Sequence, residues 1–326
     1  MSAKYPFKYC ETLGTPALRR LPERLHIKGA GDPELLLIVR LLSGAARFEH
    51  IKSDKTIKQN ENYFSEDLKG YGQRWDAKFP KLVAENYTSN LFSEFIESTR
   101  FQNKSFYKNI LAELSYYFYY QAKGGHATAF VFLYRALEHI SYAFPLIYAS
   151  KTDDFSKTFR FLQELMSGDK KSGELGFFKS FIKTVYRDDP IFESSVDFPI
   201  TLETESEQKK IFNILRELCK GNMIADATEK PRILSIHYVE IGSFIIELRN
   251  RFFHYMNGGA KNIETSNISD VDILFSLVNK KCLYWLSTVF LAVFSHAALD
   301  FESIRTSELS RPIFRFRSKS AAYSRR

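Results

Sequence analysis

One uncharged segment near the C-terminal end constrains the fold of this chain more than any other feature. Residues 282–299 read CLYWLSTVFLAVFSHAAL and contain no Asp, Glu, Lys or Arg, while Lys281 and Asp300 lie directly outside. The segment just reaches the lower length limit for a helix that crosses a bilayer. Polar residues interrupt it, and no other segment matches it, so we expect a helix buried in a protein core and no membrane partner.

A second long apolar segment predicts a helical hairpin. Residues 126–150, HATAFVFLYRALEHISYAFPLIYAS, are apolar on most sides, and the turn sequence Lys123-Gly124-Gly125 separates them from a helical pattern at 105–122. Helices that are apolar all round are buried. We therefore expect residues 105–122 and 126–150 to pack against each other in the core.

Helical spacing dominates the rest of the chain. Further helices are expected at 33–51, 73–99, 205–220, 231–255 and from Ser269-Asp270 to about Leu299, and the polar residues 52–67 are expected to form a loop. Residues 194–204, SSVDFPITLET, are the single strand-like stretch. The predicted fold class is therefore all-α, a helical bundle with an α-helical N-terminal extension.

The length of 326 residues is more than one hydrophobic core usually serves, and 44% hydrophobic residues exclude a mostly disordered chain. We expect an N-terminal helical extension at 1–100, whose role the sequence leaves open. A main helical domain follows at 101–300, with an insertion near 151–204, and a basic tail occupies 301–326.

The basic tail carries most of the formal net charge of +8. Residues 311–326 contribute six positive charges with no acid among them, from Arg311, Arg315, Arg317, Lys319, Arg325 and Arg326. Such a tail can contact RNA phosphates without reading sequence, and Arg315, Arg317 and Lys319 are the predicted RNA contacts. The alternative is a solvated, disordered C-terminus.

Several common classes of site lack support in the sequence. Three scattered cysteines give neither a disulfide framework nor a zinc site, and His and Cys do not cluster as metal ligands. The sequence KGAGDPE contains two glycines but has no predicted strand before it, so we do not predict a nucleotide-binding loop there. We therefore expect no metal and no cofactor. The first residues contain no apolar run typical of a signal peptide, which favours a cytoplasmic protein.

The strongest candidate site is in ELRNRFFHYMNGG, residues 247–259. On a helix, Asn250 and His254 share a face and Arg249 flanks it. An imidazole can move protons near neutral pH, and a guanidinium can stabilise negative charge on phosphorus. That pair suits cleavage of RNA through attack of the 2′-hydroxyl, with His254 and Arg249 catalytic and Asn250 orienting the histidine or contacting phosphate.

The same residues also fit a purely structural role, because basic residues are favoured in the last turn of a helix. The spacing is weak evidence by itself, since Arg232 and His237 repeat it and Arg20 and His26 nearly do.

The context of Arg249 gives the motif more weight. Arg249-Asn250-Arg251-Phe252-Phe253-His254 resembles the R-N-x-x-x-H motif of the HEPN superfamily, near the junction of the last two helices of the domain. The resemblance covers roughly residues 126–299, with 151–204 as an insertion. It implies an all-helical, metal-independent endoribonuclease that dimerises, so that two motifs line one cleft. Many members are prokaryotic toxins or antiviral, abortive-infection effectors.

The resemblance also implies a supporting acidic residue on an earlier helix, and Glu138 in YRALEHI is the candidate. The alternative for Glu138 is a salt bridge to Arg135. Residues 1–100 match no module that we can name, and a regulatory protein partner could bind there. Two other functions stay open: a non-catalytic adaptor that binds RNA or protein, and a membrane-associated effector that uses residues 282–299.

Overall fold

A computed structural model describes residues 5–141, 154–167, 190–254 and 262–310, together with positions 143, 146, 178, 182 and 183. This part of the chain forms ten α-helices and two three-stranded antiparallel sheets. The fold is therefore mixed α/β, and the all-α prediction, with its purely helical N-terminal extension, is wrong. One hydrophobic core is nevertheless continuous from Phe7 to Ala298.

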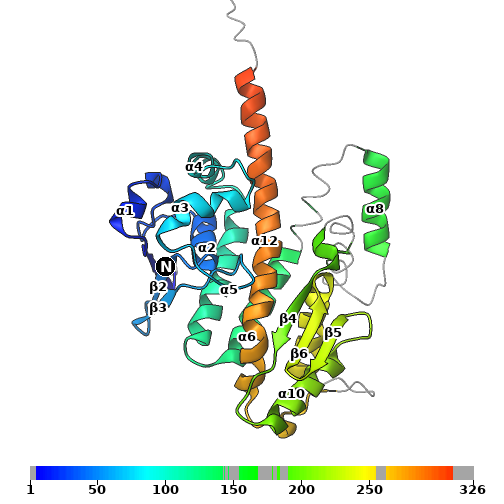
Figure 1. Cartoon of the computed structure of the whole chain (residues 1–326). Coiled ribbons are helices and arrows are strands. Elements are labelled where there is room, and N and C mark those ends of the chain that lie inside the picture. The colour runs from blue at the N-terminus through cyan, green and yellow to red at the C-terminus, as the bar shows by residue number, and fades with distance from the viewer. Residues whose placement is uncertain are drawn as a thin grey trace, which may run out of the picture.

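Helices form the centre of the molecule. Helices α5 (Lys104–Gln121) and α6 (His126–Ser141) form the predicted hairpin, and α12 (Val271–Ser310) packs along α6. The first turn of α6 is tied to α12 twice, because the Ala127 amide donates to Asp272 Oδ1 at 2.7 Å and Asn279 Nδ2 donates to the His126 carbonyl at 2.8 Å. Helix α11 (Ile241–Phe253) contacts both α6 and α12. Figure 1 shows α12 as the long axis between the two sheets.

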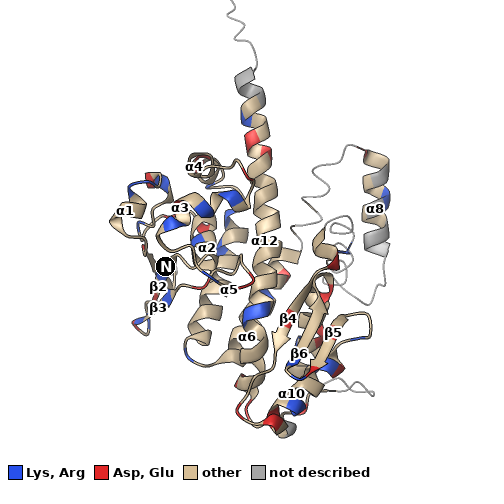
Figure 2. Ribbon diagram, in the orientation of Figure 1, with Lys and Arg blue, Asp and Glu red and all other residues tan. Residues whose placement is uncertain are grey.

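The uncharged segment of α12 is largely buried. Trp285 is fully buried against Phe178 and Tyr238, and the middle of the helix is free of charge in Figure 2. Among the described residues, α12 is the one helix long and apolar enough to cross a membrane, and 56% of its most apolar window is buried inside the structure. This packing agrees with the predicted core helix.

The N-terminal sheet contains β1 (Phe7–Cys10), β2 (Ala46–His50) and β3 (Lys55–Gln59), in the order β1-β2-β3. Helix α2 (Glu34–Leu42) packs on α5. The predicted helix at 33–51 therefore ends early, and the predicted loop contains a strand. Ala46 and Phe48 are buried and Arg47 between them is exposed, which is the alternation of a strand. The remaining N-terminal helices are α1 (Thr15–Leu18), α3 (Trp75–Lys78) and α4 (Ser89–Ser98).

Gly44 forms the sharp connection between α2 and β2. Its φ is +70°, and a Cβ there would lie 2.5 Å from the carbonyl oxygen of Asn60. We expect Gly44→Ala to lower the free energy of unfolding by ~3 kcal/mol, because the left-handed backbone and the collision with backbone atoms both oppose a side chain. Gly221→Ala is the control, since no atom lies within 4 Å of a Cβ there. Equal denaturant midpoints for the two variants would contradict the prediction.

The second sheet follows α8 (Phe155–Ser167) in the chain. It contains β4 (Ser195–Pro199), β5 (Ile224–Glu229) and β6 (Arg232–His237) in the order β4-β6-β5, and α10 (Glu205–Leu218) packs on β6. The predictions of a strand within 194–204 and of a helix at 205–220 are confirmed. The predicted helix at 231–255 is wrong in its first part, because β6 pairs with strands on both sides and α11 begins only at Ile241. Short 3-10 turns occupy Glu23–Leu25, Gly72–Arg74, Pro80–Leu82, Pro190–Glu193, Tyr238–Glu240 and Thr265–Asn267.

Candidate functional site

The Arg-Asn-x-x-x-His motif lies at the C-terminal end of α11. Arg249 and Asn250 lie four and three residues before Phe253, the last residue of the helix, and His254 is the residue that caps it. The His254 amide donates to the Asn250 carbonyl at 3.2 Å, so the four-residue spacing is helical. The backbone of His254 is extended, with φ −115° and ψ 115°, and its side chain is exposed. The histidine therefore leaves the helix where solvent or a substrate can reach it.

The Arg249 guanidinium is fixed by two uncharged groups. Its central carbon lies 4.8 Å from the centre of the Tyr134 ring on α6, and its Nη1 donates to Asn250 Oδ1 at 3.0 Å. Among the described residues, no carboxylate lies within ion-pair distance of Arg249. Because an aromatic face attracts a cation without neutralising it, Arg249 stays positioned and keeps its charge for a ligand.

Tyr134 also connects the motif to Glu138. Burial raises the pKa of the Tyr134 hydroxyl, the nearby Arg249 charge lowers this pKa, and Glu138, one turn along α6, raises it. Both charged residues thus act on the same phenol. The exposed Glu138 therefore lies near Tyr134, the residue whose ring Arg249 covers.

The predicted alternative for Glu138, a salt bridge to Arg135, is not formed. Arg135 donates through Nε and Nη2 to the two carboxylate oxygens of Glu113 on α5, at 2.9 and 2.8 Å. His139 lies 3.8 Å from the same carboxylate. Arg135 and His139 therefore tie α6 to α5, and Glu138 acts on Arg135 only as a nearby charge, which raises the pKa of Arg135 less than Glu113 does.

Aromatic packing holds the end of α11 in place. Phe253 stacks on Phe130 of α6 with ring centres 6.3 Å apart, and Phe252 lies edge-on to Phe275 of α12 at 4.9 Å. Phe253 is still 39% exposed. Two neighbouring phenylalanines therefore clamp the motif between α6 and α12 through rigid contacts.

The other basic pairs have structural roles in the described part of the chain. Arg232 is buried in β6 and bonds to Glu205, and Arg20 bonds to Asp76. Similar Arg-to-His spacings elsewhere in the sequence therefore do not by themselves indicate a functional site. The predicted RNA contacts Arg315, Arg317 and Lys319 lie outside the described residues.

The described residues contain no group of three His, Cys, Asp or Glu side chains that could hold a metal ion. Two of the three cysteines are also poor nucleophile candidates. Burial raises the pKa of the Cys219 thiol to about 12 and raises the pKa of Cys282 still further. A thiol acts as a nucleophile only when it is deprotonated, so neither cysteine is prepared for catalysis.

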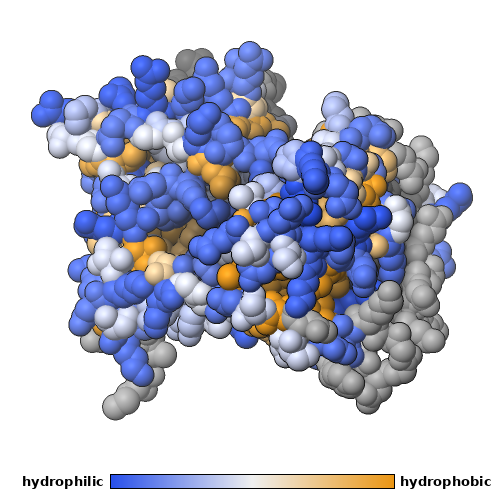
Figure 3. Space-filling model, turned by 60° about the horizontal axis from the view of Figure 1, so that its bottom comes forward, coloured by the Kyte–Doolittle hydropathy of each residue, from blue (hydrophilic) through white to orange (hydrophobic). Residues whose placement is uncertain are grey.

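The surface at one end of the molecule is largely polar (Figure 3). The end of the molecule where α6 and α12 begin comes forward in Figure 3, and this face is mostly hydrophilic with small hydrophobic patches. Sequence reasoning missed Tyr134, although it precedes Glu138 by one helical turn and therefore shares its face. A scan against protein-family models, a search of curated proteins and a search of solved structures each found no match for this chain.

Proposed function

We propose that the protein is a metal-independent endoribonuclease of the HEPN type. The observation that carries the proposal is the placement of Arg249, which lies over Tyr134 with no carboxylate partner among the described residues and belongs to the same helix end as the exposed His254. A positioned, unneutralised cation and an accessible imidazole at the same helix end are the two groups that RNA transesterification needs.

In this reaction, the 2′-oxygen attacks the adjacent phosphorus and the bond from phosphorus to the 5′-oxygen breaks. His254 accepts the 2′-hydroxyl proton or donates a proton to the leaving oxygen. Arg249 stabilises the additional negative charge of the pentavalent phosphorane. Asn250 fixes the guanidinium through its side-chain oxygen, and Glu138 and Tyr134 support it from α6. The products carry a 2′,3′-cyclic phosphate and a 5′-hydroxyl.

The proposal extends to partners and biological role. Helices α5, α6, α11 and α12 form the HEPN-like part, and the insertion between α6 and α11 includes the second sheet, so it is longer than the sequence analysis expected. RNA is the substrate, and a homodimer would bring two motifs to one cleft. The role is that of a toxin or an antiviral effector in the cytoplasm, with a regulatory protein as a candidate partner of residues 1–100.

Expression in a bacterial host separates this function from a non-catalytic RNA- or protein-binding adaptor. The wild-type protein is expected to slow growth and to fragment cellular RNA, and His254→Ala is expected to do neither. His237→Ala is the matched control, because His237 belongs to the structural pair in β6. Growth inhibition of the same size by wild type and His254→Ala would favour the adaptor.

Glu138→Gln tests the supporting role of the acid. We expect RNA cleavage to fall about tenfold, equivalent to ~1.4 kcal/mol of transition-state stabilisation, because the charge that helps to fix Tyr134 and Arg249 is removed. Stability should stay unchanged, since Glu138 is exposed and forms no ion pair with a described residue. Glu85→Gln, at an exposed position in the N-terminal part, controls for a general loss of charge. Equal rates for the two variants would remove Glu138 from the site.

A further inference from the structure

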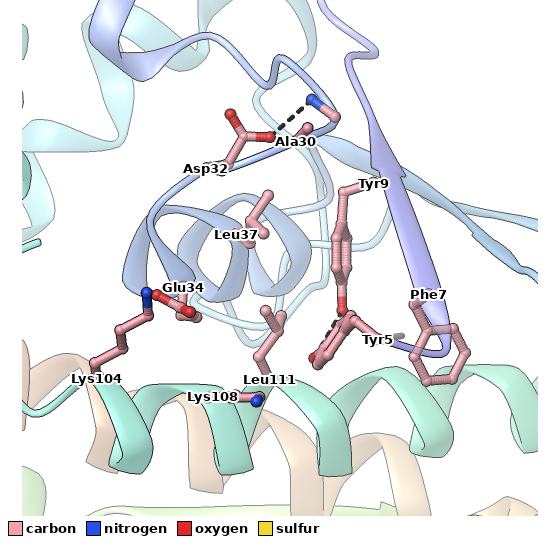
Figure 4. A pocket seen from close by; sticks show the side chains of 12 residues that line it. Tyr5, Phe7, Tyr9, Ala30, Asp32, Glu34, Leu37, Lys104, Lys108 and Leu111 are labelled. Atoms are coloured by element: carbon pink, nitrogen blue, oxygen red, sulfur yellow. Dashed lines mark hydrogen bonds between the residues drawn. The ribbon is translucent and has the colours of Figure 1, made fainter. Parts of the chain in front are cut away.

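A cavity of about 380 Å³ opens between β1, the loop before α2 and the first half of α5. Figure 4 shows α2 on one side of the cavity, α5 on the other and the tyrosines of the β1 segment between them. None of its lining residues belongs to the proposed nuclease site. The volume is within the range of small-molecule sites, which is roughly 300–1,000 Å³.

One wall of the cavity is aromatic and rigid. Tyr5, Phe7 and Tyr9 line it, and the Tyr9 hydroxyl lies 2.6 Å from Ser115 Oγ and 3.4 Å from the Tyr5 hydroxyl. Burial raises the pKa of Tyr5 to about 12, so its hydroxyl is neutral at physiological pH. The wall therefore offers a flat ring for stacking and a hydroxyl that can donate to a ligand.

The α5 side of the cavity is cationic. Lys104 and Lys108 are one helical turn apart, both line the cavity and both are exposed. Neither forms an ion pair with a described residue, and the Lys104 ammonium lies 5.8 Å from the centre of the exposed Phe101 ring. Two ammonium groups on one face of α5, without carboxylate partners within ion-pair distance, can hold an anionic group with several oxygens.

The α2 side supplies acceptors. Asp32 is already engaged, because its carboxylate accepts from the Gly29 amide at 2.8 Å and the Lys28 amide at 3.0 Å. Glu34 lines the cavity without an ion pair to a described residue, and in Figure 4 the Lys104 side chain extends from α5 toward it. Its carboxylate can accept hydrogen bonds from neighbouring hydroxyl groups.

We propose that this cavity binds a nucleoside monophosphate. The phosphate lies between Lys104 and Lys108, the ribose hydroxyls donate to Glu34, and the base packs on Tyr5. The phosphate meets ammonium groups, the ribose meets a carboxylate and the base meets an aromatic ring. A simple anion would contact only the lysines, and an aromatic compound without a phosphate would contact only the tyrosine wall. The phosphate contacts come from α5, so the KGAGDPE loop does not act as a phosphate loop and serves to shape the α2 side.

Calorimetric titration of the full-length protein with AMP, GMP, CMP and UMP tests the proposal, with adenosine and inorganic phosphate as partial ligands. At least one monophosphate should bind more tightly than both partial ligands. The Lys104→Ala/Lys108→Ala variant should weaken its binding by about tenfold or more, since two charged contacts are lost. Lys78→Ala/Lys81→Ala, at two exposed positions outside the cavity, should bind as wild type.

Three outcomes would overturn the proposal. They are failure of all four monophosphates to bind more tightly than inorganic phosphate, failure of all four to bind more tightly than adenosine, and unchanged binding of the best monophosphate by the Lys104→Ala/Lys108→Ala variant. The exposed lysines can be replaced without removing core contacts, so a folding defect does not confuse the comparison. The inference is independent of the nuclease: His254→Ala should bind the monophosphate as wild type does.

Discussion

Replacing Arg249 by alanine is expected to reduce RNA cleavage by roughly 10²- to 10³-fold, the usual effect of removing one group that stabilises transition-state charge. The fold should survive, because Arg249 is only half-buried and its contacts are one ring face and one amide. A cation–π contact of this kind contributes about 1 kcal/mol. The helical circular-dichroism signal and the oligomer mass of the purified variant should match those of wild type.

Two further variants sharpen the test of Arg249. Arg249→Lys keeps the charge but loses the planar group that lies over Tyr134, so cleavage should fall between wild type and Arg249→Ala. Arg216→Ala removes an exposed arginine on α10 and should cleave as wild type. Full activity in Arg249→Ala would remove the arginine from the reaction and leave it as a helix-end residue.

The second large effect is expected at Arg40, which is fully buried in α2. Its guanidinium pairs with Glu11, donates through Nε to the Ala45 carbonyl at 2.9 Å, and lies 4.9 Å from the ring of Trp75. Glu11 in turn accepts from the amides of Thr12, Leu13 and Ile27. Arg40 thus ties the first segment of the chain to α2 and to the turn before β2.

Arg40→Leu should lower the free energy of unfolding by ~3–5 kcal/mol, because it leaves Glu11 without its cation and the Ala45 carbonyl without its donor. Burial lowers the pKa of Arg40 while Glu11 opposes this shift, which is typical of a buried ion pair. Arg47→Leu, at an exposed position of β2, is the matched control and should change stability by less than ~0.5 kcal/mol. Chemical denaturation measures both, and a similar midpoint for the two variants would contradict the role of Arg40.

The sequence predicts the long helices well, because their local pattern and their final packing agree. The helices predicted at 105–122 and 126–150 correspond to α5 and α6, and most of residues 142–150 lie outside the described part of the chain. The uncharged segment lies in α12, which extends beyond the expected Leu299 to Ser310. Apolar residues at helical spacing decide such elements before tertiary contacts are known.

The strands could not be predicted in the same way, because each is short and depends on a partner elsewhere in the chain. Strand β3 is five mostly polar residues, KTIKQ, that become a strand by pairing with β2. Strand β6 follows Pro231, a residue that also starts helices, and its identity comes from pairing with β4 and β5. Tertiary pairing therefore overrides local propensity at these positions.

The candidate site likewise contains residues that the sequence predicts and residues that only the fold brings together. Arg249, Asn250 and His254 are close in sequence, so a motif finds them, and Glu138 follows from the resemblance. The ring of Tyr134 beneath Arg249 depends on how α6 and α11 cross, which no local pattern contains. The cavity is further from prediction, because it is assembled from residues 5–9, 29–37 and 104–111.

The most direct test of the nuclease incubates purified wild type and His254→Ala with total RNA in EDTA and analyses the ends of the fragments. The account predicts cutting by wild type alone, with 2′,3′-cyclic phosphate and 5′-hydroxyl ends, since the reaction uses the 2′-hydroxyl, Arg249 and His254. Fragments with other ends, cutting of the same extent by His254→Ala, or no cutting by wild type would contradict it.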